Sequence, residues 1–143
     1  MFSTIVVPVD PSEPEFSKLS LEAASDFAKR YGSTVHLVCV LQVLPGLVAE
    51  YLPPDYERQA VDSTRAKLKE LADTLGIPAD KAVVSVRVGG VYHEVLDEVE
   101  EIKADLIVMS SHRPAMSTYL LGSNAAKIVR HAPCSVLVLR PQD

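Results

Sequence analysis

Short apolar runs alternate with longer amphipathic stretches along the 143 residues of this chain. The apolar runs, each of a length suited to a strand, occupy residues 4–9, 35–40, 83–88, 105–109 and 135–139. Hydrophobic residues recur at helical spacing over residues 13–31, 55–75 and 91–102, and a further helix is expected to begin near Leu120. Strands that alternate with helices are typical of βαβ units. The pattern therefore predicts an α/β, Rossmann-like fold: an open five-stranded parallel sheet with helices on both faces.

The composition of each apolar run predicts where its strand lies in the sheet. Residues 4–9 and 105–109 are almost continuously apolar, which indicates strands that are covered on both faces. In residues 83–88, by contrast, valines alternate with Ser85 and Arg87, and this period of two indicates an edge or half-covered strand.

Local signals predict where the helices begin and end. Ser12, followed three residues later by Glu15, has the form of a capping box for the helix of residues 13–31, and Gly32 is expected to end that helix. Prolines and a glycine interrupt any regular period in residues 41–57, so this segment is predicted to be a loop with short irregular turns. The helix that follows it is expected to be long and mostly exposed.

Composition bounds the class of protein. A hydrophobic fraction of 48% and a charged fraction of 23% suit one globular domain, which we expect to span residues 1–143. No apolar run approaches the roughly 18 residues that a membrane span requires. The first residues show neither a basic leader nor a cleavage site, so the cytoplasm is the expected location.

Net charge and cysteine content exclude further classes. A net charge of −5 argues against nucleic acid as a partner, because such binding needs a basic surface. Cys39 and Cys134 are too few for a disulfide framework, and their apolar neighbours indicate buried thiols at strand positions.

Candidate ligand-binding residues lie where the predicted strands end. In an open parallel sheet, ligands bind beyond the carboxyl ends of the strands, where the strand order reverses. That rule selects Pro8 and Asp10 after the first strand, Val40 after the second, Gly89 and Gly90 after the third, and the stretch from Ser110 after the fourth. Asp10 either faces this cleft or caps the next helix. Ser123 and Asn124 lie in the first turn of a helix and either cap it or meet an anion such as phosphate.

Motifs of catalysis and metal binding do not occur in the sequence. There is no P-loop, no G-x-G-x-x-G after the first strand and no nucleophile elbow. The histidines have no metal-ligand spacing, so we expect neither a protein-held metal nor catalytic residues. The acidic side chains from Glu94 to Glu101 are expected to form a solvated helix face.

Four stretches carry a resemblance to a known family: IVVPVD, VHLVCV, RVGGVYHEVLDEVEEIKADLIVMSSH and LLGSNAAKIVRHAPCSVLVLR. Together they span the chain and resemble the universal stress protein family of UspA-like proteins, and SHRP followed by TYLLGSNAA resembles its small single-domain bacterial branch. The resemblance implies a strand order of 3-2-1-4-5. It also implies a homodimer, or a higher oligomer, through the fifth strand, Ser135 to Arg140, whose apolar edge invites pairing.

Nucleotide-binding members of this family resemble G-x2-G-x9-G-[ST] after the fourth strand, and this sequence departs from that pattern. Ser110 and Arg113 stand at the first two glycine positions, and only eight residues separate Arg113 from Gly122. The final Gly122-Ser123 is intact. Ser110, Ser111 and Arg113 can supply polar contacts in place of the glycines, and Arg113 suits phosphate unless it is a solvated loop residue.

Carried over position by position, the resemblance implies a site for an adenine nucleotide. Its residues are Pro8, Val9, Asp10 and Val40 around the base and ribose, Met109 and Ser110 on the far side, and His112, Arg113, Gly122, Ser123 and Asn124 near the phosphates. Val40 taken alone is equally an ordinary core valine. No residue is expected to hold a metal by itself, although Asp10 can meet Mg²⁺ that the phosphates carry.

The hypothesis that follows is a stress-response regulator that binds ATP or AMP with Mg²⁺ and reports this state to a regulatory protein partner, a class that in this family can include membrane transporters. One alternative is a nucleotide-independent dimeric adaptor that acts through its dimer surface or through residues 41–56. Another is a slow ATP hydrolase in which Asp10 positions metal or water, although no general base is evident. The expectation is therefore a binding protein, at most a weak ATPase.

Overall fold

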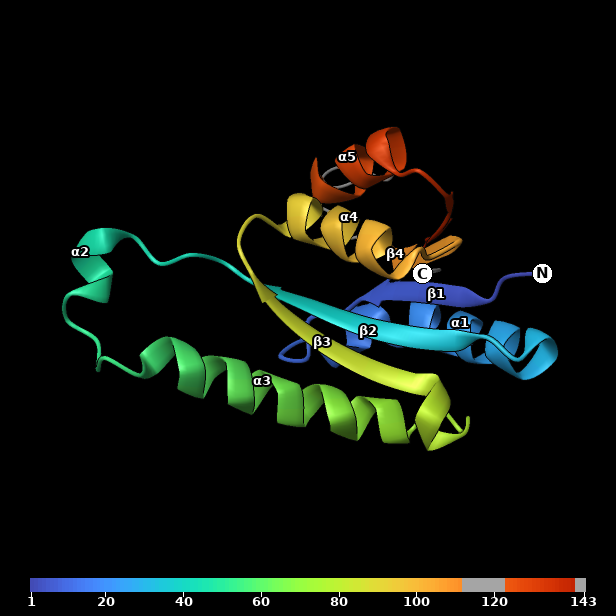
Figure 1. Cartoon of the computed structure of the whole chain (residues 1–143), viewed down its shortest axis with the longest axis horizontal. Coiled ribbons are helices and arrows are strands. Elements are labelled where there is room, and N and C mark those ends of the chain that lie inside the picture. Colours follow the sequence, from blue (N-terminus) through green and yellow to red (C-terminus); the bar gives the residue numbers. More distant parts are fainter. Residues whose placement is uncertain (112–122, 141–143) are drawn as a thin grey trace.

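The computed structural model describes residues 1–111 and 123–140 and contains one five-stranded parallel sheet (Figure 1). Its strands are β1 (Thr4–Pro8), β2 (Thr34–Leu41), β3 (Ala82–Val88), β4 (Leu106–Ser110) and β5 (Ser135–Leu139). They lie in the order β3-β2-β1-β4-β5, and every neighbouring pair is parallel. The predicted α/β fold and its strand order are therefore confirmed.

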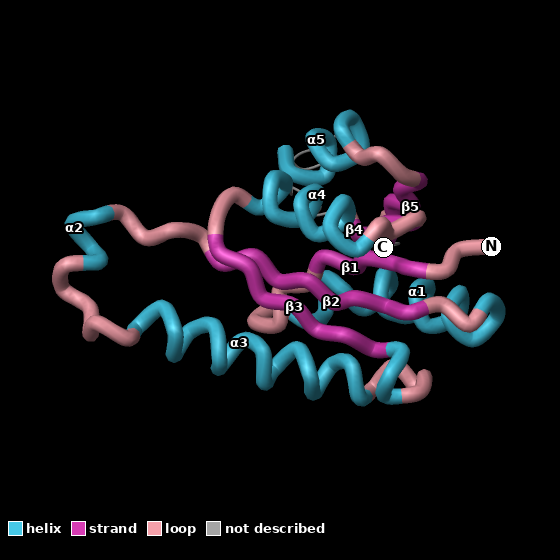
Figure 2. The backbone as a smooth tube through the Cα atoms, in the orientation of Figure 1, coloured by secondary structure: helices cyan, strands magenta, loops and turns pink. Residues whose placement is uncertain are grey.

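Two layers of helices cover the sheet (Figure 2). α1 (Lys18–Tyr31) and α3 (Tyr56–Asp73) lie on one face, and α4 (Val91–Ile102) and α5 (Ser123–His131) lie on the other. Each layer buries its own hydrophobic cluster against the sheet. The prediction of helices on both faces is thus confirmed.

The central strands are apolar because both of their faces are covered. In β1, Ile5 and Val7 pack toward α1 and α3, whereas Val6 packs toward α4, since consecutive strand residues point to opposite faces. In β4, Val108 and Ile107 divide between the two clusters in the same way. Burial of each such side chain contributes about 1.5–3 kcal/mol, so these two strands hold the layers together.

β3 and β5 form the two edges of the sheet and are less buried than the strands between them. Val83 of β3 is exposed, and the rest of that strand is half-buried. The alternation of valines with Ser85 and Arg87 predicted an edge or half-covered strand, and the structure confirms it. In β5, residues 136–139 are half-buried.

The segment between β1 and α1 does not form the predicted capping box. The backbone N–H and the hydroxyl of Ser12 both donate to Oδ1 of Asp10, at 3.0 and 2.6 Å. A short 3-10 helix, Pro14–Ser17, follows, and α1 begins only at Lys18. Glu13 precedes a proline, which disfavours the helical region for its backbone (φ −132°, ψ 65°), so the predicted helix start is wrong.

The other helix predictions that fall on described residues hold, whereas the predicted helix start near Leu120 lies outside the described residues. Gly32 ends α1 with a φ of 70°, a left-handed conformation that glycine adopts without strain. α3 buries only Leu68 and Ala72, which confirms a long and mostly exposed helix. Among the described residues, no helix is both long enough and apolar enough to cross a bilayer.

A projection between β2 and α3 extends away from the sheet and carries α2 (Gly46–Ala49) near its tip (Figure 1). We call residues 42–55 the α2 arm. The prediction of a loop with short turns is confirmed, because α2 has only 4 residues and prolines flank it on both sides.

The two thiols differ in their surroundings. Cys39 is buried within β2, as predicted. Cys134 is half-buried and lies before β5 rather than within it, so the prediction of a buried strand thiol is wrong at this position. Both thiols are free.

Candidate functional site

Two hollows meet at the carboxyl end of β1, where the strand order of the sheet reverses. We call them the β4 hollow, with a volume of about 450 Å³, and the β2 hollow, with a volume of about 580 Å³. Small-molecule sites have volumes of roughly 300–1,000 Å³. Pro8, Asp10 and Val91 line both hollows, so the two open onto the same stretch of surface.

Every described residue of the predicted site lines one of these hollows. The β2 hollow is lined by Pro8, Val9, Asp10 and Val40, and the β4 hollow by Pro8, Asp10, Met109, Ser110, Ser123 and Asn124. The structure therefore brings together side chains from β1, β2, β4 and α5. His112, Arg113 and Gly122 lie outside the described residues. That any of these side chains holds a nucleotide stays a prediction.

Asp10 faces the cleft, and the alternative that it caps the next helix is wrong, because neither the 3-10 helix nor α1 has a side-chain cap. Its Oδ1 accepts the two hydrogen bonds from Ser12, and its carbonyl accepts one from the N–H of Glu13 at 3.1 Å, so Asp10 stabilises the turn after β1. No hydrogen bond within the described ranges uses Oδ2. The side chain is exposed and lines both hollows, which leaves one carboxylate oxygen for a ligand.

Ser110, the last residue of β4, carries the clearest sign of a ligand. Its Oγ is buried and has no hydrogen-bond partner within the described part of the chain. The next residue, Ser111, continues the pairing with β5, because its N–H donates to the carbonyl of Leu139 at 2.9 Å. A buried hydroxyl left unpaired costs about 1–3 kcal/mol. Such a group at the wall of a hollow is the kind that a ligand completes.

The first described turn of α5 borders the β4 hollow. Ser123 and Asn124 are both exposed there. Backbone N–H groups at the start of a helix lack partners within the helix, and the helix dipole adds a partial positive charge. This end of the hollow is therefore suited to an anion.

Sequence reasoning missed several residues that line the hollows, among them Ser12, Glu13, Phe16, Gln42 and Val91. For Val91 a signal existed, because it begins the helix that follows the third strand end. For Phe16 there was none, because it lies in a 3-10 helix that the sequence did not predict.

Gly89 and Gly90 were selected by the same strand-end rule but line neither hollow. Gly89 has a φ of 151°, and a Cβ at this position would lie 2.8 Å from Oε2 of Glu94. Its N–H donates to the carbonyl of Leu41 at 2.9 Å. The glycine therefore lets the chain turn into α4 while Glu94 packs closely against it.

Glu94 belongs to a group of paired charges that we call the ion cluster: Ser85, Arg87, Glu94, Glu98 and Glu101. Arg87 donates to Glu94 at 2.9 Å, to Glu98 at 3.3 Å and to Glu101 at 3.0 and 3.3 Å. Ser85 donates to Glu98 at 2.7 Å. The prediction of a solvated acidic face is wrong for Glu98, which is only 6% exposed, because Arg87 on β3 supplies its counter-charge.

The electrostatics of this region follow from pairing and burial. The hydrogen bond to Glu101 is the main cause that raises the pKa of Arg87, and Arg87 in turn lowers the pKa of Glu101. Burial lowers the pKa of His36, against the opposing charge of Glu98. Burial, with the charge of Asp10 as a smaller cause, raises the pKa of Cys39 to about 11. The Cys39 thiol is therefore protonated at neutral pH and is not a nucleophile.

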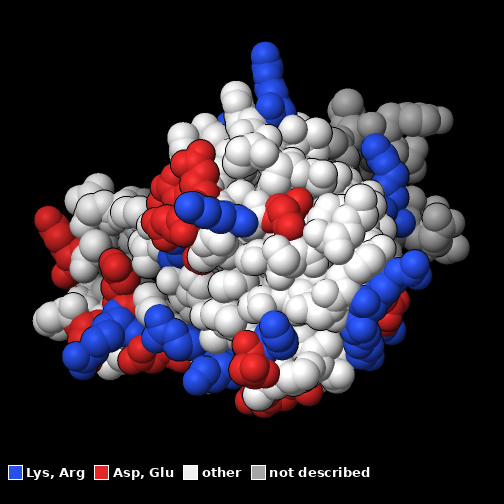
Figure 3. Space-filling model, turned by 45° about the vertical axis from the view of Figure 1, so that its right-hand side comes forward, with Lys and Arg blue, Asp and Glu red and all other residues white. Residues whose placement is uncertain are grey.

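Neither the volume of the other surface grooves nor the distribution of surface charge indicates a better candidate site. A groove of about 680 Å³ lies between α1 and α3, but its rim mixes Lys18 and Lys29 with Glu22 and Asp26. The sides of helices offer no free backbone groups. On the face that Figure 3 shows, acidic and basic side chains are interspersed around a largely uncharged centre. The two hollows at the end of β1 are thus the candidate site.

Comparison with known proteins assigns the chain to a family. The model of the universal stress protein family matches residues 1–140. Universal stress protein G of Escherichia coli O157:H7 is 34% identical over 143 residues, which cover 98% of this chain and 100% of that relative. The chain belongs to the universal stress protein family, and the resemblance carried by its sequence is confirmed.

Solved structures of universal stress proteins share the fold. UspA from Lactobacillus plantarum is 25% identical with a TM-score of 0.70, covering 96% of this chain and 97% of that one. A universal stress protein in complex with cAMP is 22% identical with a TM-score of 0.70, covering 96% and 97%. One from Archaeoglobus fulgidus in complex with dAMP is 19% identical with a TM-score of 0.66, covering 95% and 96%. The last two likenesses show the fold alone.

Proposed function

We propose that this protein binds an adenine nucleotide, ATP or AMP, across the two hollows and acts as a stress-response regulator rather than an enzyme. The observation that carries the proposal is the buried, unpartnered Oγ of Ser110 at the wall of the β4 hollow. Membership of the family, and the cAMP and dAMP complexes of two proteins with this fold, support a nucleotide as the ligand.

The two hollows suit different parts of a nucleotide. The β2 hollow, lined by Val9 and Val40, offers apolar contacts to a base and its ribose. The β4 hollow offers the hydroxyl of Ser110 and the start of α5 to phosphates. His112, Arg113 and Gly122 join the phosphate side on sequence grounds.

Mg²⁺ would arrive with the phosphates rather than on a site of its own. Within the described residues, no group of three or more His, Cys, Asp or Glu side chains can hold a metal. Asp10, with Oδ2 outside the turn, supplies the hard oxygen that Mg²⁺ prefers next to phosphate oxygens.

A homodimer through β5 completes the proposal. β5 is an edge strand with half-buried apolar side chains on both faces, and such an edge pairs readily with a second chain. The cytoplasmic location expected from the sequence belongs to the same proposal. Sedimentation of the purified protein tests the dimer directly, and a monomer at all concentrations would reject it.

Isothermal titration of the purified protein with ATP and with AMP, each with Mg²⁺, tests the site. Mass spectrometry first establishes that no nucleotide has co-purified. We expect one nucleotide per subunit at micromolar affinity, or about −8 kcal/mol. No heat and no co-purified nucleotide would reject the site and favour the nucleotide-independent adaptor.

Ser123→Glu locates the phosphates. An acidic residue is favourable in the first turn of a helix, so the fold should persist while the added charge repels phosphate and abolishes binding. Val129→Glu adds the same charge to the same helix, but Val129 is exposed and lines neither hollow. This variant should bind the nucleotide with normal affinity. Equal affinity of both variants would place the phosphates elsewhere.

A further inference from the structure

The α2 arm and the start of α3 expose an unusual amount of apolar surface. Of the twelve exposed large hydrophobic side chains among the described residues, six lie here: Val43, Leu44, Leu47, Val48, Tyr51 and Tyr56. Leu47 is 76% exposed and Tyr51 is 86% exposed. Isolated exposed side chains are ordinary, but a contiguous group of this kind marks an interaction surface.

A groove lies beside these side chains. It has a volume of about 480 Å³ and is bordered by the arm, by Leu41 and Val88 at the ends of β2 and β3, and by Tyr56 and Ala60 at the start of α3. Most of its lining is apolar. The groove thus provides room for a few hydrophobic side chains next to the exposed apolar side chains of the arm.

The backbone of the arm is stiffened. Pro45 precedes α2, and Pro53 and Pro54 follow it, and each proline fixes one backbone dihedral. A surface that is held in one conformation before binding loses less entropy when it binds. The arm is therefore suited to present its apolar side chains to a partner.

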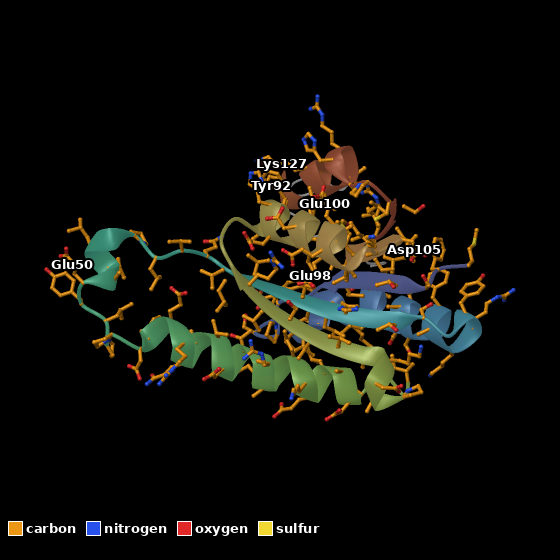
Figure 4. All side chains as sticks on the ribbon, in the orientation of Figure 1. Glu50, Tyr92, Glu98, Glu100, Asp105 and Lys127 are labelled. Atoms are coloured by element: carbon orange, nitrogen blue, oxygen red, sulfur yellow. The ribbon has the colours of Figure 1, made fainter. Side chains whose placement is uncertain are left out.

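The charge of the arm indicates the chemistry of that partner. Glu50, Asp55 and Glu57 are acidic, and no Lys or Arg occurs in the sequence between Arg30 and Arg58. None of the ion pairs found within the described ranges involves these three carboxylates. Figure 4 shows Glu50 near the tip of the arm, far from the other labelled side chains.

We propose that the α2 arm and its groove form a docking surface for a basic amphipathic segment of another protein, one that carries large apolar side chains flanked by Lys or Arg. The apolar side chains enter the groove and cover Leu47 and Tyr51, and the basic side chains pair with Glu50 and Glu57. The groove adjoins the β2 hollow, because Leu41 and Gln42 line both, but Asp10, Ser110 and α5 do not border it.

A second copy of this chain suits the surface less well. A two-fold contact through the arm would bring the two sets of carboxylates together, because the same patch meets itself. The net charge of −5 adds to that repulsion. An anionic membrane would be repelled for the same reason.

The test uses a labelled 18-residue Leu/Lys peptide, designed as an amphipathic helix, and follows its fluorescence anisotropy with the full chain. The control peptide replaces every Lys with Glu. We expect saturable binding of one Lys peptide per subunit, at least about tenfold tighter than that of the Glu peptide. Equal affinities for the two peptides would overturn the proposal.

Matched variants separate the arm from the general acidity of the chain. Leu47→Asp and Tyr51→Asp remove apolar contact while adding negative charge, and each should weaken Lys-peptide binding about tenfold. Val129→Asp adds the same charge on α5, at an exposed valine outside the arm, and should leave binding unchanged. If the two arm variants bind as the wild type does, the peptide binds elsewhere and the proposal is wrong.

A charge reversal tests the basic half of the partner. Glu50→Lys combined with Glu57→Lys should weaken binding and flatten its salt dependence, whereas Glu100→Lys on α4 should do neither. Circular dichroism checks that each variant is folded. Sedimentation tests whether the arm binds a second copy of this chain. If Leu47→Asp converts an oligomer into a monomer, the arm is a contact between copies and the proposal is overturned.

Discussion

At the carboxyl end of β3 the polar side chains contact one another, whereas at the carboxyl end of β4 a buried hydroxyl has no partner within the described residues. In the ion cluster, Arg87 alone makes hydrogen bonds to three glutamates. In the β4 hollow, Ser110 Oγ is buried and unpaired. Both regions lie at strand ends, where the rule for open parallel sheets places ligands.

This difference in hydrogen bonding distinguishes polar groups that stabilise the fold from polar groups that can bind a ligand. A buried charge that is fully paired holds a helix against a strand and offers nothing to a ligand. A buried polar atom that lacks a partner destabilises the free protein, and this cost is recovered when a ligand supplies the hydrogen bond. Strand-end position alone therefore does not identify a site, and hydrogen-bond satisfaction is what distinguishes the two regions.

The largest loss of stability is expected when a charge of the ion cluster is removed. Arg87→Met leaves Glu98 buried without its counter-charge, and such changes cost about 3–5 kcal/mol of unfolding free energy. Urea unfolding followed by circular dichroism measures this loss. Arg65→Met is the control, since its pair with Asp62 is exposed, at 44% and 65%, and contributes less than about 1 kcal/mol. A loss below that of the control would mean that the cluster is solvated after all.

Gly89→Ala should destabilise the same end of the sheet by a smaller amount. The new Cβ would approach Oε2 of Glu94 to 2.8 Å at a φ of 151°, which only glycine adopts readily. Backbone strain of this kind costs about 1–3 kcal/mol. Gly46→Ala is the matched control, because a Cβ there meets no atom within 4 Å, and its unfolding free energy should be unchanged or higher. Equal stability of the two variants would contradict the assigned role of Gly89.

Ser110→Ala, unlike Arg87→Met, should weaken ligand binding without lowering the unfolding free energy. Removal of an unpaired buried hydroxyl leaves the unfolding free energy unchanged within about 0.5 kcal/mol or raises it. The loss of one ligand hydrogen bond should weaken nucleotide binding about fivefold. Urea unfolding and calorimetric titration measure the two quantities on the same preparation. A destabilised variant with unchanged affinity would remove the distinction between the two regions.

His36 adds a small dependence on pH beside the ion cluster. Burial lowers its pKa in the folded state below the unfolded value of about 6.5. As the pH falls through that value, the unfolded state takes up a proton before the folded state does, so the histidine's contribution to stability is lost. Unfolding free energies at about pH 7.5 and 5.5 should therefore differ less for His36→Gln than for the wild type. An equal or larger difference in the variant would contradict the lowered pKa.

The apolar runs were sufficient to predict the five strands, because each run carries its own signal, whereas the strand order came from the family resemblance. Continuous apolar composition predicts β1 and β4 as central strands, and alternation predicts β3 as an edge. The capping box at Ser12 failed because Pro14, two residues on, restricts the backbone of Glu13 more strongly than the Ser12 hydroxyl can favour a helix.

The ion cluster was beyond sequence reasoning. Arg87 and Glu98 lie on different elements, and their spacing does not show which face of α4 meets β3. The strand-end rule selected Asp10 and Ser110 from position alone, whereas the burial of Ser110 Oγ became visible only in the folded chain.

The strand order has a consequence for how this chain is made. Of the five strands, β1 leaves the ribosome first but lies at the centre of the sheet, and one of its two neighbours is β4, the fourth strand along the chain. The carboxylate of Asp105 accepts hydrogen bonds from the N–H groups of Ser3 and Thr4 across separations of 102 and 101 residues. During synthesis the apolar flank of β1 stays uncovered until β4 emerges, and a nascent chain that stalls before Asp105 carries an open strand that chaperones or other unfinished chains can pair with.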